Sequence, residues 1–63
     1  MATLLTLKTV IARTTYSRSQ IYRLESAGHF PKRIIIGKGR IAWLEHEVDD
    51  WIDSKASKRQ LHP

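Results

Sequence analysis

The stretch Ser17-Arg18-Ser19-Gln20-Ile21-Tyr22-Arg23-Leu24-Glu25-Ser26-Ala27-Gly28 carries the strongest structural signal in the chain. Ser17 is a favourable N-cap residue, and Gln20 follows three positions later, which is the spacing of a capping box. Gly28 can adopt the left-handed conformation that ends a helix, and Pro31 prevents the helix from continuing. We therefore predict a helix from Arg18 to about Ala27.

The two sides of this helix differ in chemistry. At 100° per residue, one side gathers the residues expected to pack against the protein, Ser17, Ile21, Leu24 and Gly28. The opposite arc carries longer and more polar side chains, Arg18, Ser19, Tyr22, Arg23 and Ser26. We expect the first side to contact the core and the second to face a polar partner.

A shorter helix is predicted before this one. Thr6 can act as an N-cap, and the apolar residues Leu7, Val10 and Ile11 recur at positions i, i+3 and i+4. The spacing predicts a helix from Leu7 to Arg13. The following Thr14-Thr15-Tyr16 lacks a continuing apolar stripe, so we expect a tight turn between the two helices.

The next part of the chain has the composition of a β-hairpin. Arg33-Ile34-Ile35-Ile36 and Ile41-Ala42-Trp43 are short apolar runs, rich in β-branched and aromatic residues. Between them, Gly37-Lys38-Gly39-Arg40 contains glycines that permit a positive φ at the tip. We predict a hairpin from which Lys38 and Arg40 project.

A third helix is predicted from about Leu44 to Lys55. Leu44, Val48, Trp51 and Ile52 lie at i, i+4, i+7 and i+8, which places them on one stripe. We expect Trp51 of this stripe to lie in the core, together with Ile21, Phe30 and Trp43. We expect one domain over residues 1–55 and a basic, flexible tail over residues 56–63.

The charges are unevenly distributed along the 63 residues. The chain has 11 Lys and Arg and six Asp and Glu, a net charge of +5. From Met1 to Trp43 eight basic residues face a single acid, Glu25, a net +7, whereas residues 44 to 53 carry five acids and no base, a net −5. This polarity favours a directed contact with a phosphate backbone.

Several other classes of function lack support in the sequence. A chain of this length has little room for a catalytic cleft, and it contains no cysteine for a disulfide or a thiolate zinc site. His29, His46 and His62 lack a metal-ligand spacing, and Gly37-Lys38-Gly39 lacks the Gly-Lys-Ser/Thr ending of a phosphate loop. We therefore expect no enzyme, catalytic residue, metal or cofactor.

Nothing in the sequence predicts a membrane or secreted location. No run of about 18 apolar residues is present, and the N-terminus lacks the basic region of a secretion signal. We expect a cytoplasmic protein.

Two helices joined by a tight turn, then a basic hairpin and a packing helix, form the order of a helix-turn-helix with a wing. The fold is thus expected to be mainly α with a small β-hairpin. The strings that follow match a known family: Ser17-Arg18-Ser19-Gln20-Ile21-Tyr22-Arg23-Leu24, Gly28-His29-Phe30-Pro31-Lys32, Arg40-Ile41-Ala42-Trp43 and Glu47-Val48-Asp49-Asp50-Trp51-Ile52. From Leu7 to Lys55 the chain resembles the AlpA family of phage-type transcriptional regulators.

This resemblance implies a winged helix-turn-helix related to the excisionase and MerR-like DNA-binding domains of prophages and integrated elements. The second helix would then enter the major groove, where Arg18, Ser19 and Gln20 reach base edges, with arginine and guanine as the leading pair. The expected contacts to phosphates or to an adjacent minor groove come from six further residues, Tyr22, Arg23, Lys32, Arg33, Lys38 and Arg40. Other roles remain open: Gln20 serving only the capping box, Tyr22 covering a core edge, and Lys38 and Arg40 adding solubility.

The function expected from these features is sequence-specific binding of double-stranded DNA by a transcriptional regulator in the bacterial cytoplasm, at the nucleoid. One alternative is an excisionase that bends attachment-site DNA. Another is a protein-interaction module that acts through the acidic third helix. Candidate protein partners are an integrase, RNA polymerase or further copies of the chain.

Overall fold

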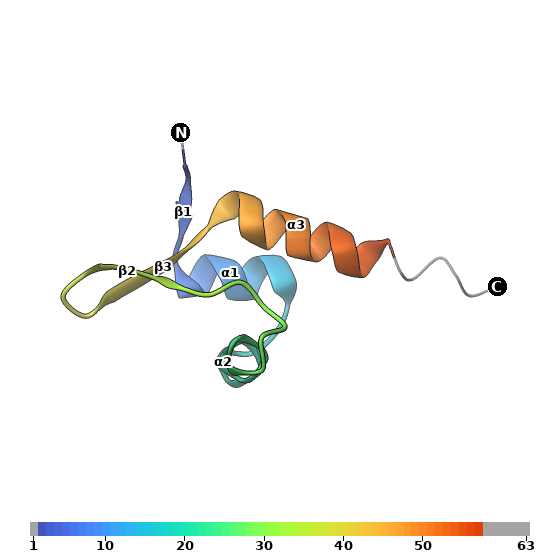
Figure 1. Ribbon diagram of the computed structural model, residues 1–63, viewed down its shortest axis with the longest axis horizontal. Helices are drawn as coiled ribbons and strands as arrows, with labels where there is room; N and C mark the ends of the chain where they lie inside the picture. The colour runs from blue at the N-terminus through green and yellow to red at the C-terminus, as the bar shows by residue number, and fades with distance from the viewer. Residues whose placement is uncertain (1, 58–63) are drawn as a thin grey trace.

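The computed structural model describes residues 2–57, which form three helices and three short strands (Figure 1). In chain order they are β1 (Leu4–Leu5), α1 (Leu7–Thr14), α2 (Arg18–Ser26), β2 (Ile34–Gly37), β3 (Arg40–Leu44) and α3 (Glu45–Ala56). The predicted architecture, mainly α with a β-hairpin, is confirmed. The third helix runs one residue past the predicted end of the domain, and residues 58–63 of the predicted tail lie outside the described residues.

Each helix of the predicted helix-turn-helix begins at the expected cap. The Thr6 hydroxyl accepts a hydrogen bond from the backbone N–H of Thr9 at 3.2 Å, which starts α1. The capping box of α2 is complete, because Ser17 Oγ accepts from the Gln20 N–H at 3.2 Å and Gln20 Oε1 accepts from the Ser17 N–H at 3.1 Å.

The far end of α2 is closed by glycine as predicted. Gly28 has a φ of 82°, and its N–H donates to the carbonyl of Glu25 while the N–H of His29 donates to the carbonyl of Leu24. This pair of bonds is a Schellman motif, which satisfies carbonyls that the end of a helix leaves unpaired. The chain then turns toward β2.

The sheet contains the predicted hairpin and one strand that was not predicted. β2 and β3 pair antiparallel, with a bulge between Ile35 and Gly37, and Gly39 has a positive φ at the tip. β1 pairs antiparallel with the other edge of β3, where Leu5 lies opposite Trp43. A strand of two residues is too short to show an alternating pattern, so the sequence did not reveal it.

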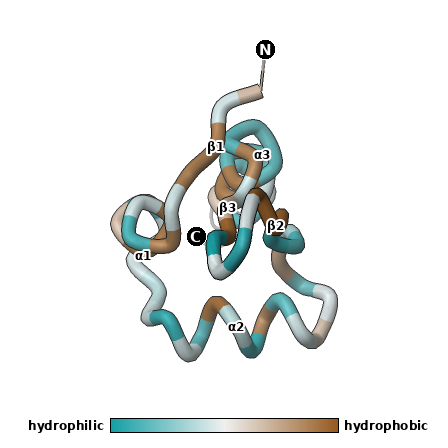
Figure 2. Tube along the Cα trace, turned by 90° about the vertical axis from the view of Figure 1, so that its left-hand side faces the viewer, coloured by the Kyte–Doolittle hydropathy of each residue, from teal (hydrophilic) through white to brown (hydrophobic). Residues whose placement is uncertain are grey.

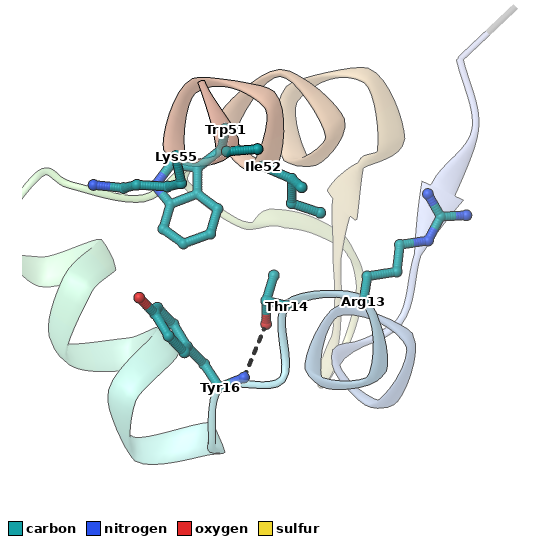
Figure 3. A pocket seen from close by; sticks show the side chains of 7 residues that line it. Arg13, Thr14, Tyr16, Trp51, Ile52 and Lys55 are labelled. Carbon is teal, nitrogen blue, oxygen red and sulfur yellow. Dashed lines mark hydrogen bonds between the residues drawn. The ribbon is translucent and has the colours of Figure 1, made fainter. Parts of the chain in front are cut away.

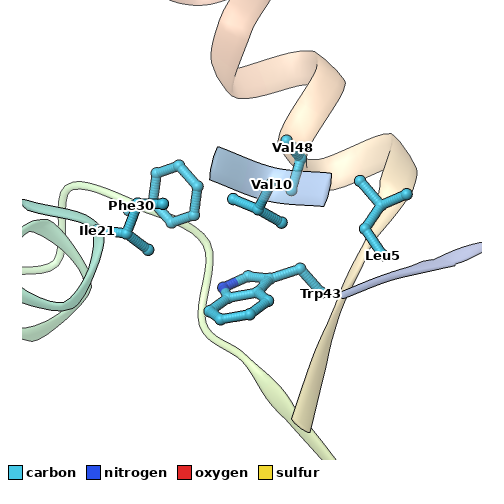
Figure 4. Packing of buried hydrophobic residues seen from close by; sticks show 6 residues of the cluster. All are labelled: Leu5, Val10, Ile21, Phe30, Trp43 and Val48. Atoms are coloured by element: carbon cyan, nitrogen blue, oxygen red, sulfur yellow. The ribbon is translucent and has the colours of Figure 1, made fainter. Parts of the chain in front are cut away.

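The core lies where the helices meet β3 (Figure 4). Its buried side chains are Leu5, Val10, Ile21, Phe30, Trp43 and Val48. The indole N–H of Trp43 donates to the carbonyl of Pro31 at 3.1 Å, so the buried ring has a partner for its one polar atom. Three of the four predicted core residues named above are buried, and the fourth, Trp51, is half-buried against the core.

The basic helix α2 and the acidic helix α3 lie on different sides of α1. Both views place α3 above α1 and α2 below it, and Figure 2 shows α2 running along one outer edge of the molecule. The wing formed by β2 and β3 projects away from the helices in Figure 1. The fold therefore exposes α2 and the tip of the hairpin, while α3 lies on the other side of α1 from α2.

Candidate nucleic-acid interface

The exposed surface of α2 contains four of the nine residues predicted to contact DNA. Within α2 the exposed side chains are Arg18, Ser19, Gln20, Arg23 and Ser26. Tyr22 is half-buried and packs against the core, and part of its side chain remains accessible. α2 thus offers two guanidinium groups, two hydroxyls and an amide to a ligand along one outer edge.

The packing side of α2 differs from the predicted one. Ile21 is buried and Leu24 half-buried as expected, but Ser17 and Gly28 are exposed because they lie at the helix ends. Gln20 is also exposed, and its amide oxygen serves the capping box. The place beside Ile21 is taken instead by Glu25, one turn further along the helix.

The first turn of α2 carries the three candidates for base contacts. Arg18, Ser19 and Gln20 are all exposed there. Among residues 2–57, the ion pairs of the arginines involve Arg13 and Arg33, so neither Arg18 nor Arg23 is engaged in one. Their guanidinium groups are available to an external acceptor.

The wing places two cations at its tip. Lys38 and Arg40 flank Gly39 and are exposed, and no ion pair in the described part of the chain uses either. Ile35 on β2 is 78% exposed, so this edge of the sheet is also apolar. The tip can approach a phosphate without first breaking an internal contact.

Arg33 is the one predicted cationic contact that forms an ion pair within the described residues. Its Nη2 lies 3.1 Å from Glu25 Oε1, and its guanidinium lies over the ring of Tyr22, 4.9 Å from the centroid. Lys32, the neighbouring candidate, is exposed. The start of β2 is therefore tied to the end of α2 through a carboxylate and an aromatic ring.

Arg13 joins α1 to α3 and is not part of the α2 surface. Its Nη2 lies 2.9 Å from Glu45 and its Nη1 2.9 Å from Asp49. Through these contacts, one cation of the basic N-terminal part of the chain pairs with two acids of the acidic segment over residues 44 to 53. α2 lies on the other side of α1 from α3, and the hairpin projects away from the helices (Figure 1).

A shallow pocket of about 270 Å³ separates the α1–α2 turn from α3 (Figure 3). Tyr16 and Trp51 meet edge to face across it, with ring centroids 5.6 Å apart, and Trp51 meets Phe30 in the same way at 4.9 Å. Lys55 lies over the ring of Trp51, and the Tyr16 N–H donates to Thr14 Oγ1. These contacts hold the turn against α3, and the residues lining the pocket include no carboxylate or imidazole.

Two further properties concern only the part of the chain that the structure describes. Residues 2–57 contain no cluster of three or more His, Asp or Glu side chains placed to hold a metal ion. None of their helices has the length and apolar content needed to cross a bilayer.

Two helices joined by a tight turn, a hairpin wing and a packing helix define a winged helix-turn-helix protein. The chain belongs to the family of the prophage CP4-57 regulatory protein (AlpA), whose model matches residues 3–56. This confirms the resemblance found in the sequence, and it makes the chain a member of a prophage regulatory family.

A phage protein is also similar to this chain. The uncharacterized protein ORF88 of enterobacteria phage P4 is 39% identical over 44 residues, which cover 70% of this chain and 50% of that protein. The match therefore spans about half the length of this curated relative.

Glu25 is the residue of this region that the sequence analysis did not assign to a site. It is 6% exposed, and it is the one acid among eight basic residues in the first 43 positions. Its spacing of four from Ile21 places both side chains on the same side of a helix, which was the available signal. The tendency of carboxylates to stay exposed argued against that position.

Proposed function

We propose that this chain is a sequence-specific, double-stranded DNA-binding regulator of a prophage or integrated element. α2 enters the major groove, Arg18, Ser19 and Gln20 contact base edges, and Arg23 contacts phosphates. The wing residues Lys38 and Arg40 contact the backbone beside the groove, and Tyr22, Lys32 and Arg33 add contacts at the junction of α2 and the wing. The protein acts in the bacterial cytoplasm, at the nucleoid.

The observation that carries this proposal is the exposed, cationic surface of α2 at an outer edge of the fold. An α-helix with its side chains is about 10–12 Å across, and the major groove is about 12 Å wide. Membership of a prophage regulatory family also supports DNA binding through this helix.

The test is a salt titration of DNA binding. Duplex fragments from the DNA around the chain's own gene are compared with a random-sequence duplex of equal length. We expect the parent protein to prefer one of the local fragments, with log K falling linearly as log salt rises, because bound phosphates release counterions. No binding to any duplex at low salt would overturn the proposal in favour of a protein-interaction module.

Two variants separate base contacts from backbone contacts. Arg18→Ala is expected to cost about 1–3 kcal/mol on the preferred fragment and to relax base choice, whereas Lys38→Ala should weaken binding to all sequences alike. Equal losses on preferred and random DNA for Arg18→Ala would remove this residue from the base-contacting set.

The same DNA surface would serve a regulator of transcription and an excisionase, and DNA bending distinguishes them. An excisionase is expected to bend attachment-site DNA sharply, which fluorescence energy transfer between the ends of a labelled duplex would measure. One such domain covers a short site, so useful specificity requires neighbouring copies, an integrase or RNA polymerase. Binding of a lone monomer at nanomolar affinity without cooperativity would contradict that requirement.

A further inference from the structure

Glu25 occupies an unusual position for a carboxylate at the end of a helix. It lies in the last turn of α2, where the helix dipole does not favour a negative charge, and its side chain is only 7% exposed. Both of its oxygens have partners: Oε2 accepts from the backbone N–H of Arg33 at 2.6 Å, and Oε1 pairs with Arg33 Nη2 at 3.1 Å. The carboxylate thus holds the backbone and the side chain of the same residue.

The guanidinium of Arg33 is fixed from a second direction as well. It lies over the ring of Tyr22, 4.9 Å from the centroid, while the side chain keeps 42% of its surface exposed. An arginine has five N–H donors in a rigid fork, and the contact with Glu25 Oε1 is made through Nη2. Donors therefore remain for an acceptor in solvent.

The exposed part of this arginine borders a hollow of about 220 Å³. The hollow is lined by Glu25, Ser26, Lys32 and Arg33, where the loop after α2 leads into β2. Two cations, one hydroxyl and the carboxylate of Glu25, which is paired with Arg33, thus surround a space at the junction of the helix and the wing. With two cations against one carboxylate the set keeps a net positive charge, and a tetrahedral oxyanion is the ligand whose charge and acceptor number fit it.

We propose that this hollow is a backbone-phosphate site of the bound DNA, in which Arg33 and Lys32 bind the phosphate and Glu25 is a positioning residue for Arg33. The proposal rests on the proposed function, since it assigns one phosphate of the duplex to a specific place. An arginine already held between a carboxylate and an aromatic ring loses less rotamer freedom when it binds. Because Glu25 also bonds the Arg33 backbone, it sets the distance between α2 and the wing.

For a variant that lacks the Glu25 charge, the proposal predicts a change in DNA affinity opposite in sign to the change expected from net charge alone. Removing an acid raises the net charge by one, and general attraction to DNA should then increase. Glu25→Gln keeps the size of the side chain and an oxygen that can accept from the Arg33 N–H, but it loses the ion pair. We expect this variant to bind a random-sequence duplex about tenfold more weakly, with the slope of log K against log salt reduced by up to about 0.9.

Asp53→Asn is the matched control. Asp53 is an exposed acid of α3, a helix that lies on the other side of α1 from α2 (Figure 1), and it makes no ion pair within the described residues. The control makes the same change of charge and should bind the duplex as tightly as the parent or more tightly. Equal affinities and slopes for Glu25→Gln and Asp53→Asn would overturn the proposal.

A second pair of variants leaves the net charge unchanged. Arg33→Lys removes the forked guanidinium group and its stacking on the ring of Tyr22, and it should weaken duplex binding about fivefold. Arg13→Lys makes the same exchange in the other arginine–carboxylate cluster, which joins α1 to α3, and should leave duplex binding unchanged. If circular dichroism shows Glu25→Gln unfolded at the assay temperature, this pair decides, and equal binding by both variants overturns the proposal.

The outcomes separate this inference from the proposed function. A parent protein that binds no duplex overturns both. A parent that prefers a local fragment, together with Glu25→Gln and Arg33→Lys variants that bind like their controls, overturns the phosphate site alone. A parent without sequence preference whose variants lose affinity as expected supports the phosphate site and contradicts the sequence-specific regulator.

Discussion

Thr15 ends α1 in a conformation that β-branched residues rarely adopt. Its φ is 64° and its ψ 7°, in the left-handed region, and its N–H donates to the carbonyl of Ile11 at 2.8 Å. For residues other than glycine, asparagine and aspartate this region is strained. The turn that sets the direction of α2 is therefore held in place by the packing around it.

Thr15→Gly is expected to stabilise the protein. Glycine adopts the left-handed conformation without a steric penalty, and this gain should exceed its extra entropy in the unfolded chain by about 0.5–1 kcal/mol. Urea unfolding followed by circular dichroism would measure the change. Ala12→Gly, at an exposed position inside α1, is the control and should cost about 1 kcal/mol; equal losses for both variants would show that Thr15 is not strained.

At the level of elements, the two-residue strand β1 connects parts of the fold that are distant in sequence. Leu5 pairs with Trp43 of β3 and is 5% exposed, and the carbonyl of Thr3 accepts a hydrogen bond from the N–H of Glu45 at 2.8 Å. This bond engages the first N–H of α3, a helix whose N-cap residue, Leu44, provides no side-chain cap. Thr3 thus acts as a backbone cap for α3, and β1, which follows it, is an edge strand of the sheet.

Truncating the two leucines of β1 should have very different effects. Leu5→Ala leaves a cavity against the core and should lower the free energy of unfolding by about 2–4 kcal/mol. Leu4→Ala removes a side chain that is 46% exposed and should cost less than about 1 kcal/mol. Chemical denaturation of both variants would test this, and similar midpoints would mean that β1 contributes only its backbone pairing.

For the molecule as a whole, the small size of the core makes ligand binding important for stability. Seven apolar residues are buried among those described, and domains of about 60 residues bury only about 60% of their unfolded surface. Arg13 adds a clamp between α1 and α3, but its side chain and those of its partners are more than one third exposed, so solvent screens the pair. A bound duplex should therefore add noticeably to the stability of the fold.

We expect DNA to raise the melting temperature in a salt-dependent way. At a free duplex concentration about 100 times Kd, linkage adds about 2.7 kcal/mol, which corresponds to roughly 10–20 °C for a domain of this size. Melting followed by tryptophan fluorescence, with and without the preferred duplex, would measure it. The shift should shrink for Arg18→Ala and at high salt, and a shift insensitive to both would argue against binding through α2.

Much of the fold could be predicted because its signals are local. The capping box at Ser17 and Gln20, the glycine after α2 and the apolar spacing in α1 and α3 act over one or two helical turns, so they are visible in the order of residues. The basic character of α2 and the wing follows from composition in the same way. The helix that carries the candidate interface was therefore identified from the sequence with its beginning correct and its end within one residue.

The contacts between segments were decided by the tertiary structure. The eight positions between Glu25 and Arg33, and the 36 between Arg13 and Asp49, are bridged only once the chain is folded, and the pairing of Leu5 with Trp43 is likewise long-range. Burial of Glu25 depends on which surface covers α2, since a carboxylate enters a core only where donors are waiting for it. Local sequence thus specifies which elements form and which side chains they carry, while packing selects which of those side chains are held in place and which stay available to a partner.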